Sequence, residues 1–144
     1  MTSALENLLK ISRGGLKVEP ANQSEIDGLI RSAKRKRQDA SIFGLGEESQ
    51  FDLLYNAAHA LALAALRRQG YRSENRYLVF QALAHTVNFP AAKWRIFDRC
   101  HHLRNLAEYE GCFDVDQQLI EELATVTFEL ESAVDAIREL KGAL

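Results

Sequence analysis

The stretch that decides the fold runs from Ser49 to Gln69 and reads SQFDLLYNAAHALALAALRRQ. Its apolar residues recur every three or four positions, as they do along one face of an α-helix. They are Phe51, Leu54, Tyr55, Ala58, Leu61, Ala62, Ala65 and Leu66. Another side carries the small residues Ala57, Ala60 and Ala64. A helix that is apolar on most of its circumference is typical of a bundle centre or an interface between helices.

The sequence on either side predicts further helices, and no segment alternates between apolar and polar residues over a useful length. We expect N-caps at Ser24, Ser73 and Asp114, Pro90 at the first position of a helix, and a helix end at Gly111. The predicted helices cover about residues 2–12, 24–37, 49–69, 73–87, 90–110 and 114–140. The chain is therefore predicted to be all-α, an up-and-down bundle of five or six helices.

Length and composition place the chain among ordinary globular proteins. Its 144 residues, 47% of them hydrophobic and 26% charged, fit a single domain over residues 1–144, with residues 1–20 as a candidate short appendage. No apolar run approaches the roughly 20 residues that span a membrane, and the N-terminus lacks the order of a signal peptide. Two cysteines, Cys100 and Cys112, form no disulfide framework. We therefore expect a cytoplasmic protein without a membrane partner.

The formal net charge of -2 hides an uneven distribution along the chain. Residues 67–104 carry eight Lys and Arg residues against two acids, whereas residues 105–144 carry ten acids against two basic residues. The basic middle either complements the acidic end within one molecule or forms a patch for an anionic partner. The run of four cations at residues 34–37 is predicted to be a solvated helix end, because consecutive helical residues point in different directions.

A second stretch, Phe97 to Gly111, places charge beside an apolar seam. The seam consists of Ile96, Cys100, Leu103 and Ala107, and the neighbouring row consists of Trp94, Phe97, His101, Arg104 and Glu108. One interpretation is a boundary arginine that pairs with Glu108 one turn later. The other is a polar site at the edge of the bundle. His59 leaves a similar choice between a hydrogen-bonded core histidine and a functional one.

Several common chemistries lack their residues in this sequence. His101 and His102 are adjacent and point about 100° apart on a helix, so they do not share a metal ion without distortion. The loop with Gly44 and Gly46 follows no predicted strand and is therefore no phosphate-binding motif. A nucleophile elbow would also require strands. We predict no metal and no cofactor.

Three segments together resemble the HEPN family (higher eukaryotes and prokaryotes nucleotide-binding). They are Arg104-Asn105 followed by Glu108-Tyr109, the segment Tyr55 to His59, and the segment Leu66 to Arg72. The resemblance covers roughly residues 24–140 and rests on the Arg-Asn pair, the Ala-rich helix and the order of helices. It implies a small helical bundle, usually dimeric, that is found with minimal nucleotidyltransferases in toxin–antitoxin and defence loci.

In catalytic members of that family, Arg and usually Asn are followed by His after four to six intervening residues, and two such motifs cleave RNA without metal. Arg104 and Asn105 match the first two places, but Tyr109 occupies the first permitted place of the His. Arg95 has His101 and His102 at permitted spacing but lacks the following Asn. An unperturbed tyrosine titrates near ~10, so Tyr109 is a poor substitute for a proton-transferring imidazole.

The leading hypothesis is thus a homodimeric HEPN-type protein that binds RNA, a nucleotide or a nucleotidyltransferase. Its predicted site contains a cleft and a surrounding positive field, formed by Arg104, Asn105, Tyr109, Glu108, Arg99, Arg95 and Lys93. The first alternative is a metal-independent ribonuclease that uses Arg95 or Arg104 with His101 or His102. The second is a structural dimerisation scaffold without a ligand.

The predicted core gives a first test. Leu61 lies in the middle of the longest apolar stripe, so Leu61→Ala should lower the free energy of unfolding by about 2–5 kcal/mol through lost burial and a residual cavity. Lys36→Ala, in the basic run, should change it by less than about 0.5 kcal/mol. Urea denaturation of both variants measures the difference, and equal values would show that the core is misplaced.

Overall fold

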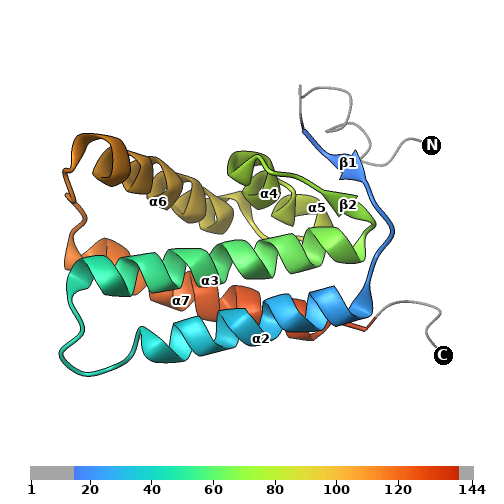
Figure 1. Ribbon diagram of the computed structural model, residues 1–144, viewed down its shortest axis with the longest axis horizontal. Helices are drawn as coiled ribbons and strands as arrows, with labels where there is room; N and C mark the ends of the chain where they lie inside the picture. The colour runs from blue at the N-terminus through green and yellow to red at the C-terminus, as the bar shows by residue number, and fades with distance from the viewer. Residues whose placement is uncertain (1–14, 140–144) are drawn as a thin grey trace.

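The computed structural model describes residues 15–139 and shows a bundle of helices with a two-stranded sheet at one end (Figure 1). Helices make up 70% of the described residues, which confirms the predicted all-α bundle. The predicted helix over residues 2–12 lies outside the described residues. The last helix ends at Asp135, several residues before its predicted end at about residue 140. No helix between residues 15 and 139 is long and apolar enough to cross a membrane.

Helix α3 runs through the middle of the bundle, and every other helix packs against it (Figure 1). Two long helices, α2 and α7, contact α3 and one another, whereas α4, α5 and α6 cover a different side of it. The helices are α2 (Gln23–Asp39), α3 (Glu47–Arg68), α4 (Arg76–Gln81), α5 (Leu83–Thr86), α6 (Ala91–Glu110) and α7 (Gln117–Asp135). The prediction that α3 is the central helix is confirmed.

The small residues of α3 lie inside the bundle. Ala57 and Ala64 are completely buried and Ala60 is 9% exposed, within a core that also contains Leu61 and Tyr55. Small side chains allow neighbouring helices to approach closely. The face with the small residues is therefore covered by helices of the same chain, and a homodimer would need another surface.

The helix starts differ from prediction by two residues in three places. The N-cap side chains accept hydrogen bonds of 3.0, 3.2 and 2.8 Å from Glu25, Leu78 and Leu119, and they belong to Asn22, Asn75 and Asp116. The predicted N-caps were Ser24, Ser73 and Asp114. Ser, Asn and Asp have nearly equal intrinsic preferences for the N-cap position, so tertiary packing decides which of two nearby residues caps the helix. Pro90 is likewise the N-cap of α6, one residue before the helix, whereas Gly111 ends α6 with a φ of 67° as expected.

The predicted helix over residues 73–87 is two short helices, α4 and α5, that meet at Ala82. The small sheet was also not predicted: β1 (Lys17–Val18) pairs with β2 (Tyr71–Arg72) in antiparallel register. A two-residue strand is too short to show the alternation that identifies strands. Residues 15–20 were part of the predicted appendage, but they pack against the bundle through this pairing and the buried Leu16.

The basic run at residues 34–37 is only partly solvated. Lys34 Nζ lies 2.8 Å from a carboxylate oxygen of Asp135, and Arg37 binds Glu131 through two hydrogen bonds of 2.7 and 3.1 Å. Both acids belong to α7, and Glu131 is 7% exposed. Two of the four cations therefore join α2 to α7, which corrects the prediction of a solvated helix end.

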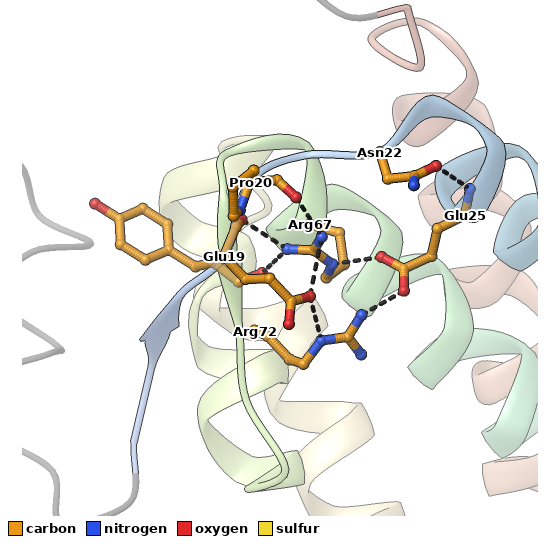
Figure 2. Close-up of polar contacts among 7 residues, drawn as sticks. Glu19, Pro20, Asn22, Glu25, Arg67 and Arg72 are labelled. Carbon is orange, nitrogen blue, oxygen red and sulfur yellow. Dashed lines mark hydrogen bonds and ion pairs between the residues drawn. The ribbon is translucent and has the colours of Figure 1, made fainter.

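Arg67, at the end of α3, is the largest fully buried side chain among the described residues and is 2% exposed. Figure 2 shows its guanidinium enclosed by oxygen atoms of Glu19, Pro20 and Glu25. Nε donates to Glu25 (2.5 Å), Nη2 to the carbonyl of Pro20 (2.7 Å), and Nη1 to the carbonyls of Glu19 (3.0 Å) and Tyr71 (3.1 Å). One side chain thus joins the C-terminal end of α3 to β2, to α2 and to the segment that enters α2.

The acids around Arg67 are shared with Arg72, which binds the carboxylates of both Glu19 and Glu25. Burial by itself would raise the pKa of Glu25, but hydrogen bonds from Arg67 and Arg72 outweigh it and lower that pKa below 4.5. The Glu25 carboxylate has a higher pKa in the unfolded chain than in the folded protein. Its contribution to the free energy of unfolding is therefore complete above pH 4.5 and is lost as the pH falls through the lower pKa of the folded protein.

We expect Arg67→Ala to lower the free energy of unfolding by about 3–5 kcal/mol, the usual cost of breaking a buried ion pair. Arg68→Ala is the matched control, because Arg68 adjoins Arg67 but makes one exposed hydrogen bond of 3.3 Å to the Glu139 carbonyl. It should cost less than about 1 kcal/mol. Chemical denaturation at pH 7 measures both, and similar losses would contradict the structural role of Arg67.

Candidate functional site

Aromatic and imidazole rings from three helices meet beside α3. The hydroxyl of Tyr55 on α3 lies 2.7 Å from Nδ1 of His101 on α6, and the two rings stack with centroids 6.1 Å apart. One turn along α3, His59 contacts the edge of Phe80 on α4, which also contacts Tyr55. Tyr55 is fully buried, whereas His101 and His59 are half-buried. The histidines therefore lie where the core meets the solvent.

Two arginines converge on the Tyr55 ring from different helices. The guanidinium carbon of Arg76, on α4, lies 5.5 Å from the ring centroid, and that of Arg104, on α6, lies 5.3 Å from it. Both distances are in the range of cation–π contacts. Arg76 also donates to the side-chain oxygen of Asn56 at 3.4 Å. One buried tyrosine is thus contacted by two positive charges from different helices.

Carboxylates neutralise this pair of charges incompletely. Glu108 lies 3.7 Å from Arg104, is 57% exposed on its side chain, and occupies the next turn of α6. Among residues 15–139, no carboxylate lies within ion-pair distance of Arg76. Like charges that share one ring repel each other, more strongly where water is partly excluded. An anion bound between the two guanidinium groups would relieve this repulsion.

Both histidines are neutral at neutral pH. Burial, and then the charge of Arg76, lowers the pKa of His59 from 6.5 to about 4. Burial and Arg76 also lower the pKa of His101, although Asp98 acts in the opposite direction. Burial raises the pKa of the Tyr55 hydroxyl, which stays protonated. The positive charge of the site therefore comes from arginine, and the rings provide neutral hydrogen-bonding groups.

The neutral ring of His101 directs the Tyr55 hydroxyl. The side-chain nitrogen of Asn105 lies 3.4 Å from Nε2 of His101. Donation to Nε2 places the ring proton on Nδ1, which then donates to the Tyr55 oxygen. This bond lies within the core, because Tyr55 is fully buried. Asn105 is thereby a positioning residue for the pair Tyr55–His101.

The structure brings together some of the predicted site residues and separates others. Arg104, Asn105, Glu108 and His101 share the side of α6 that faces α3, and the predicted pairing of Arg104 with Glu108 is confirmed. Tyr109 is 83% exposed and contributes to none of the contacts described above. Exposed side chains on other faces of α6 are His102, Arg95 and Arg99, and Lys93 pairs with Glu129 on α7. Because successive residues turn by about 100°, neighbours in sequence diverge in space.

Sequence reasoning missed the partners that come from other elements. Tyr55 was assigned to the core, which is correct but incomplete, because its hydroxyl also forms a hydrogen bond with His101 on α6. Asn56 and His59, polar residues embedded in an apolar helix, were the available signal. Arg76 gave no signal, since its place beside Tyr55 depends on the packing of α4 against α3.

Within residues 15–139, no group of three or more His, Cys, Asp or Glu side chains is arranged to hold a metal ion. No family model, curated protein or solved structure matches the chain. The chemistry of the site therefore comes from its own geometry, a pair of arginines on a tyrosine with two neutral histidines.

The site predicts the titration of His59. In the folded protein its pKa should be about 4, and Arg76→Ala should raise it, although burial keeps it below 6.5. Because the unfolded chain binds this proton near 6.5, the free energy of unfolding should fall by up to about 3 kcal/mol as pH drops from 6.5 to 4. NMR titration of the ring protons measures the pKa, with Arg95→Ala as the control that leaves it unchanged. A folded His59 that titrates above pH 6 would contradict the burial.

Proposed function

We propose that this protein is a HEPN-type helical bundle that binds the phosphate groups of single-stranded RNA or of a nucleotide. The observation that carries the proposal is the convergence of Arg76 and Arg104 on the Tyr55 ring with Glu108 as the nearby carboxylate partner. Guanidinium groups bind phosphate oxygens through two parallel hydrogen bonds. A phosphate between them would replace the missing negative charge.

Neutral groups support the two arginines from the side of the core. The Tyr55 hydroxyl lies at the centre of the cluster, and His101 and Asn105 fix the direction of its hydrogen. Tyr55 itself is fully buried, so its ring holds the arginines in place and the phosphate contacts the arginines alone. Arg95 and Arg99, exposed on α6, would add a weaker and longer-range attraction for an RNA chain.

The HEPN assignment is supported by the helical bundle and by the place of Arg104 and Asn105 beside an imidazole. It brings with it a homodimer, a nucleotidyltransferase partner, a toxin–antitoxin or defence context and a cytoplasmic location, all of which belong to the proposal. Since α3 is covered within one chain, a dimer would have to use an outer surface such as that of α6.

One observation favours a second function, metal-independent RNA cleavage. His101 precedes Arg104 by one turn and meets it at Tyr55, so an imidazole lies beside the arginine pair despite the absence of His after Asn105. Once Nε2 gives up its 3.4 Å contact with Asn105, the neutral imidazole can accept the proton of a ribose 2′-hydroxyl as that oxygen attacks the adjacent phosphorus. The P–O5′ bond then breaks, and the leaving 5′-oxygen takes a proton from water. Cleavage would require this proton transfer, whereas binding would not.

Titration of a labelled single-stranded RNA tests the binding proposal. Arg76→Ala and Arg104→Ala should each weaken binding by about 1.5–3 kcal/mol, which is more than about tenfold. Arg104→Lys should restore little of it, because an ammonium lacks the planar fork. Arg99→Ala, on an exposed face of the same helix, is the control and should cost about twofold. Unchanged affinity in folded Arg76→Ala and Arg104→Ala proteins would refute the site.

The same samples separate binding from catalysis. Incubation of the labelled RNA with the wild-type protein and EDTA, followed by gel analysis, detects metal-independent cleavage. If cleavage occurs, His101→Ala should abolish it while it changes RNA affinity much less than Arg104→Ala does. Intact RNA with wild-type affinity would leave binding as the function.

A further inference from the structure

A pocket of about 180 Å³ adjoins the arginine cluster, between the first turns of α3 and the last turns of α6. Arg104 belongs to both, because its guanidinium lies over Tyr55 and also lines the pocket. The pocket therefore begins where the proposed phosphate site ends. Whatever occupies it would be attached to, or lie beside, the bound phosphate.

Aromatic rings and carboxylates line this pocket together. Phe51 and Phe113 meet edge to face, with centroids 5.7 Å apart, and Glu48 and Asp52 extend from successive turns of α3. Glu108 lies opposite, on α6. Among the described residues, neither Glu48 nor Asp52 has a cationic partner within ion-pair distance. Two carboxylates are thus free to accept hydrogen bonds beside an aromatic wall.

The side chains that line this pocket disfavour a phosphate and favour a nucleobase. The three carboxylates repel an anion, so the phosphate of a bound nucleotide is directed to Arg76 and away from the pocket. The volume is below that of pockets for drug-sized ligands, roughly 300–1,000 Å³, and suits one flat heterocycle. Bases of single-stranded RNA characteristically stack on aromatic side chains and present their edges to polar groups.

Guanine is the base whose edges match both kinds of polar group. One of its edges carries two adjacent donors, N1–H and the 2-amino group, for which a carboxylate provides two acceptors. Another carries the acceptors O6 and N7, for which arginine is the commonest partner. Adenine and cytosine offer a single exocyclic amino donor, and uracil offers a single ring N–H. A pocket with Arg104 on one side and Asp52 and Glu48 on another is complementary to guanine.

We infer that the pocket between α3 and α6 is a guanine-binding subsite, so that the protein prefers single-stranded RNA or nucleotides that contain guanine. This inference rests on the proposed function, since the phosphate of the same nucleotide occupies the arginine cluster. The half-buried ring of Phe113, backed by the buried Phe51, contacts the base, Glu48 and Asp52 accept its hydrogen bonds, and Arg104 joins the two subsites.

The test compares short oligouridine RNAs that differ at one central position, which is guanosine, inosine, adenosine, cytidine or uridine. Inosine differs from guanosine by the loss of the 2-amino group alone. The full-length wild-type protein, titrated at fixed salt, should bind the guanosine RNA about tenfold more tightly than the others. Asp52→Asn and Glu48→Gln should reduce this preference to about twofold, with the affinity for the uridine RNA almost unchanged.

Glu47→Gln is the matched control, because Glu47 adjoins Glu48 in the first turn of α3 but does not line the pocket. It removes the same charge from the same helix end, so any general effect of charge appears in both variants. Because Asp52 and Glu48 are exposed, their variants should keep the wild-type melting temperature. Phe113→Leu, which keeps an apolar side chain but removes the ring, should weaken binding of the guanosine RNA most.

The outcomes separate the two proposals. Equal affinity for all five RNAs, preference for cytidine, or a guanine preference that survives in Asp52→Asn and Glu48→Gln would overturn the guanine subsite while the phosphate site stands. Binding of agmatine, an alkyl guanidinium that also carries an ammonium group, would overturn it too if that binding depends on Asp52 and excludes guanosine, because the pocket would then hold a cation. If no RNA binds, the proposed function fails and the subsite fails with it.

Discussion

The buried charge of Arg67 constrains the whole N-terminal half of this bundle. A guanidinium that is 2% exposed requires oxygen partners for its N–H groups, since an unpaired buried cation is very costly. Arg67 obtains them from Glu25 and from three backbone carbonyls. The chain that enters α2 and the turn into β2 must therefore come to the end of α3, where, against the effect of burial, Arg67 and Arg72 lower the pKa of Glu25.

The contacts of Arg67 also hold α3 in the position from which it supports the candidate site. Its C-terminal end is held by Arg67, and its middle is closely packed through Ala57 and Ala64, so Tyr55 and His59 have fixed places. A rigid helix is a good support for a binding site, because the side chains that it presents have little conformational freedom to lose. Helix α3 therefore contributes residues to both the core and the candidate site.

The site itself contains unfavourable electrostatics that the core can support. Arg76 and Arg104 approach one ring, and His59 is buried with a pKa of about 4. Polar groups that are held in unfavourable places are commonly found at functional sites. Here the cost is met by packing elsewhere in the bundle, and a bound anion would reduce it.

The sequence by itself determined the all-α fold class and the central place of α3, because the spacing of apolar residues along a helix is a local property. It also determined the end of α6 at Gly111, because glycine readily adopts the left-handed conformation that ends a helix. It also placed Arg104 beside Glu108, since residues four apart on a helix are always neighbours. The two-residue strands and the choice among adjacent caps were decided by tertiary packing, because local preferences there are nearly equal. So was the meeting of Arg76 with Tyr55 and His101. Those residues lie on three helices, and only the packing of α4 and α6 against α3 brings their side chains to one point.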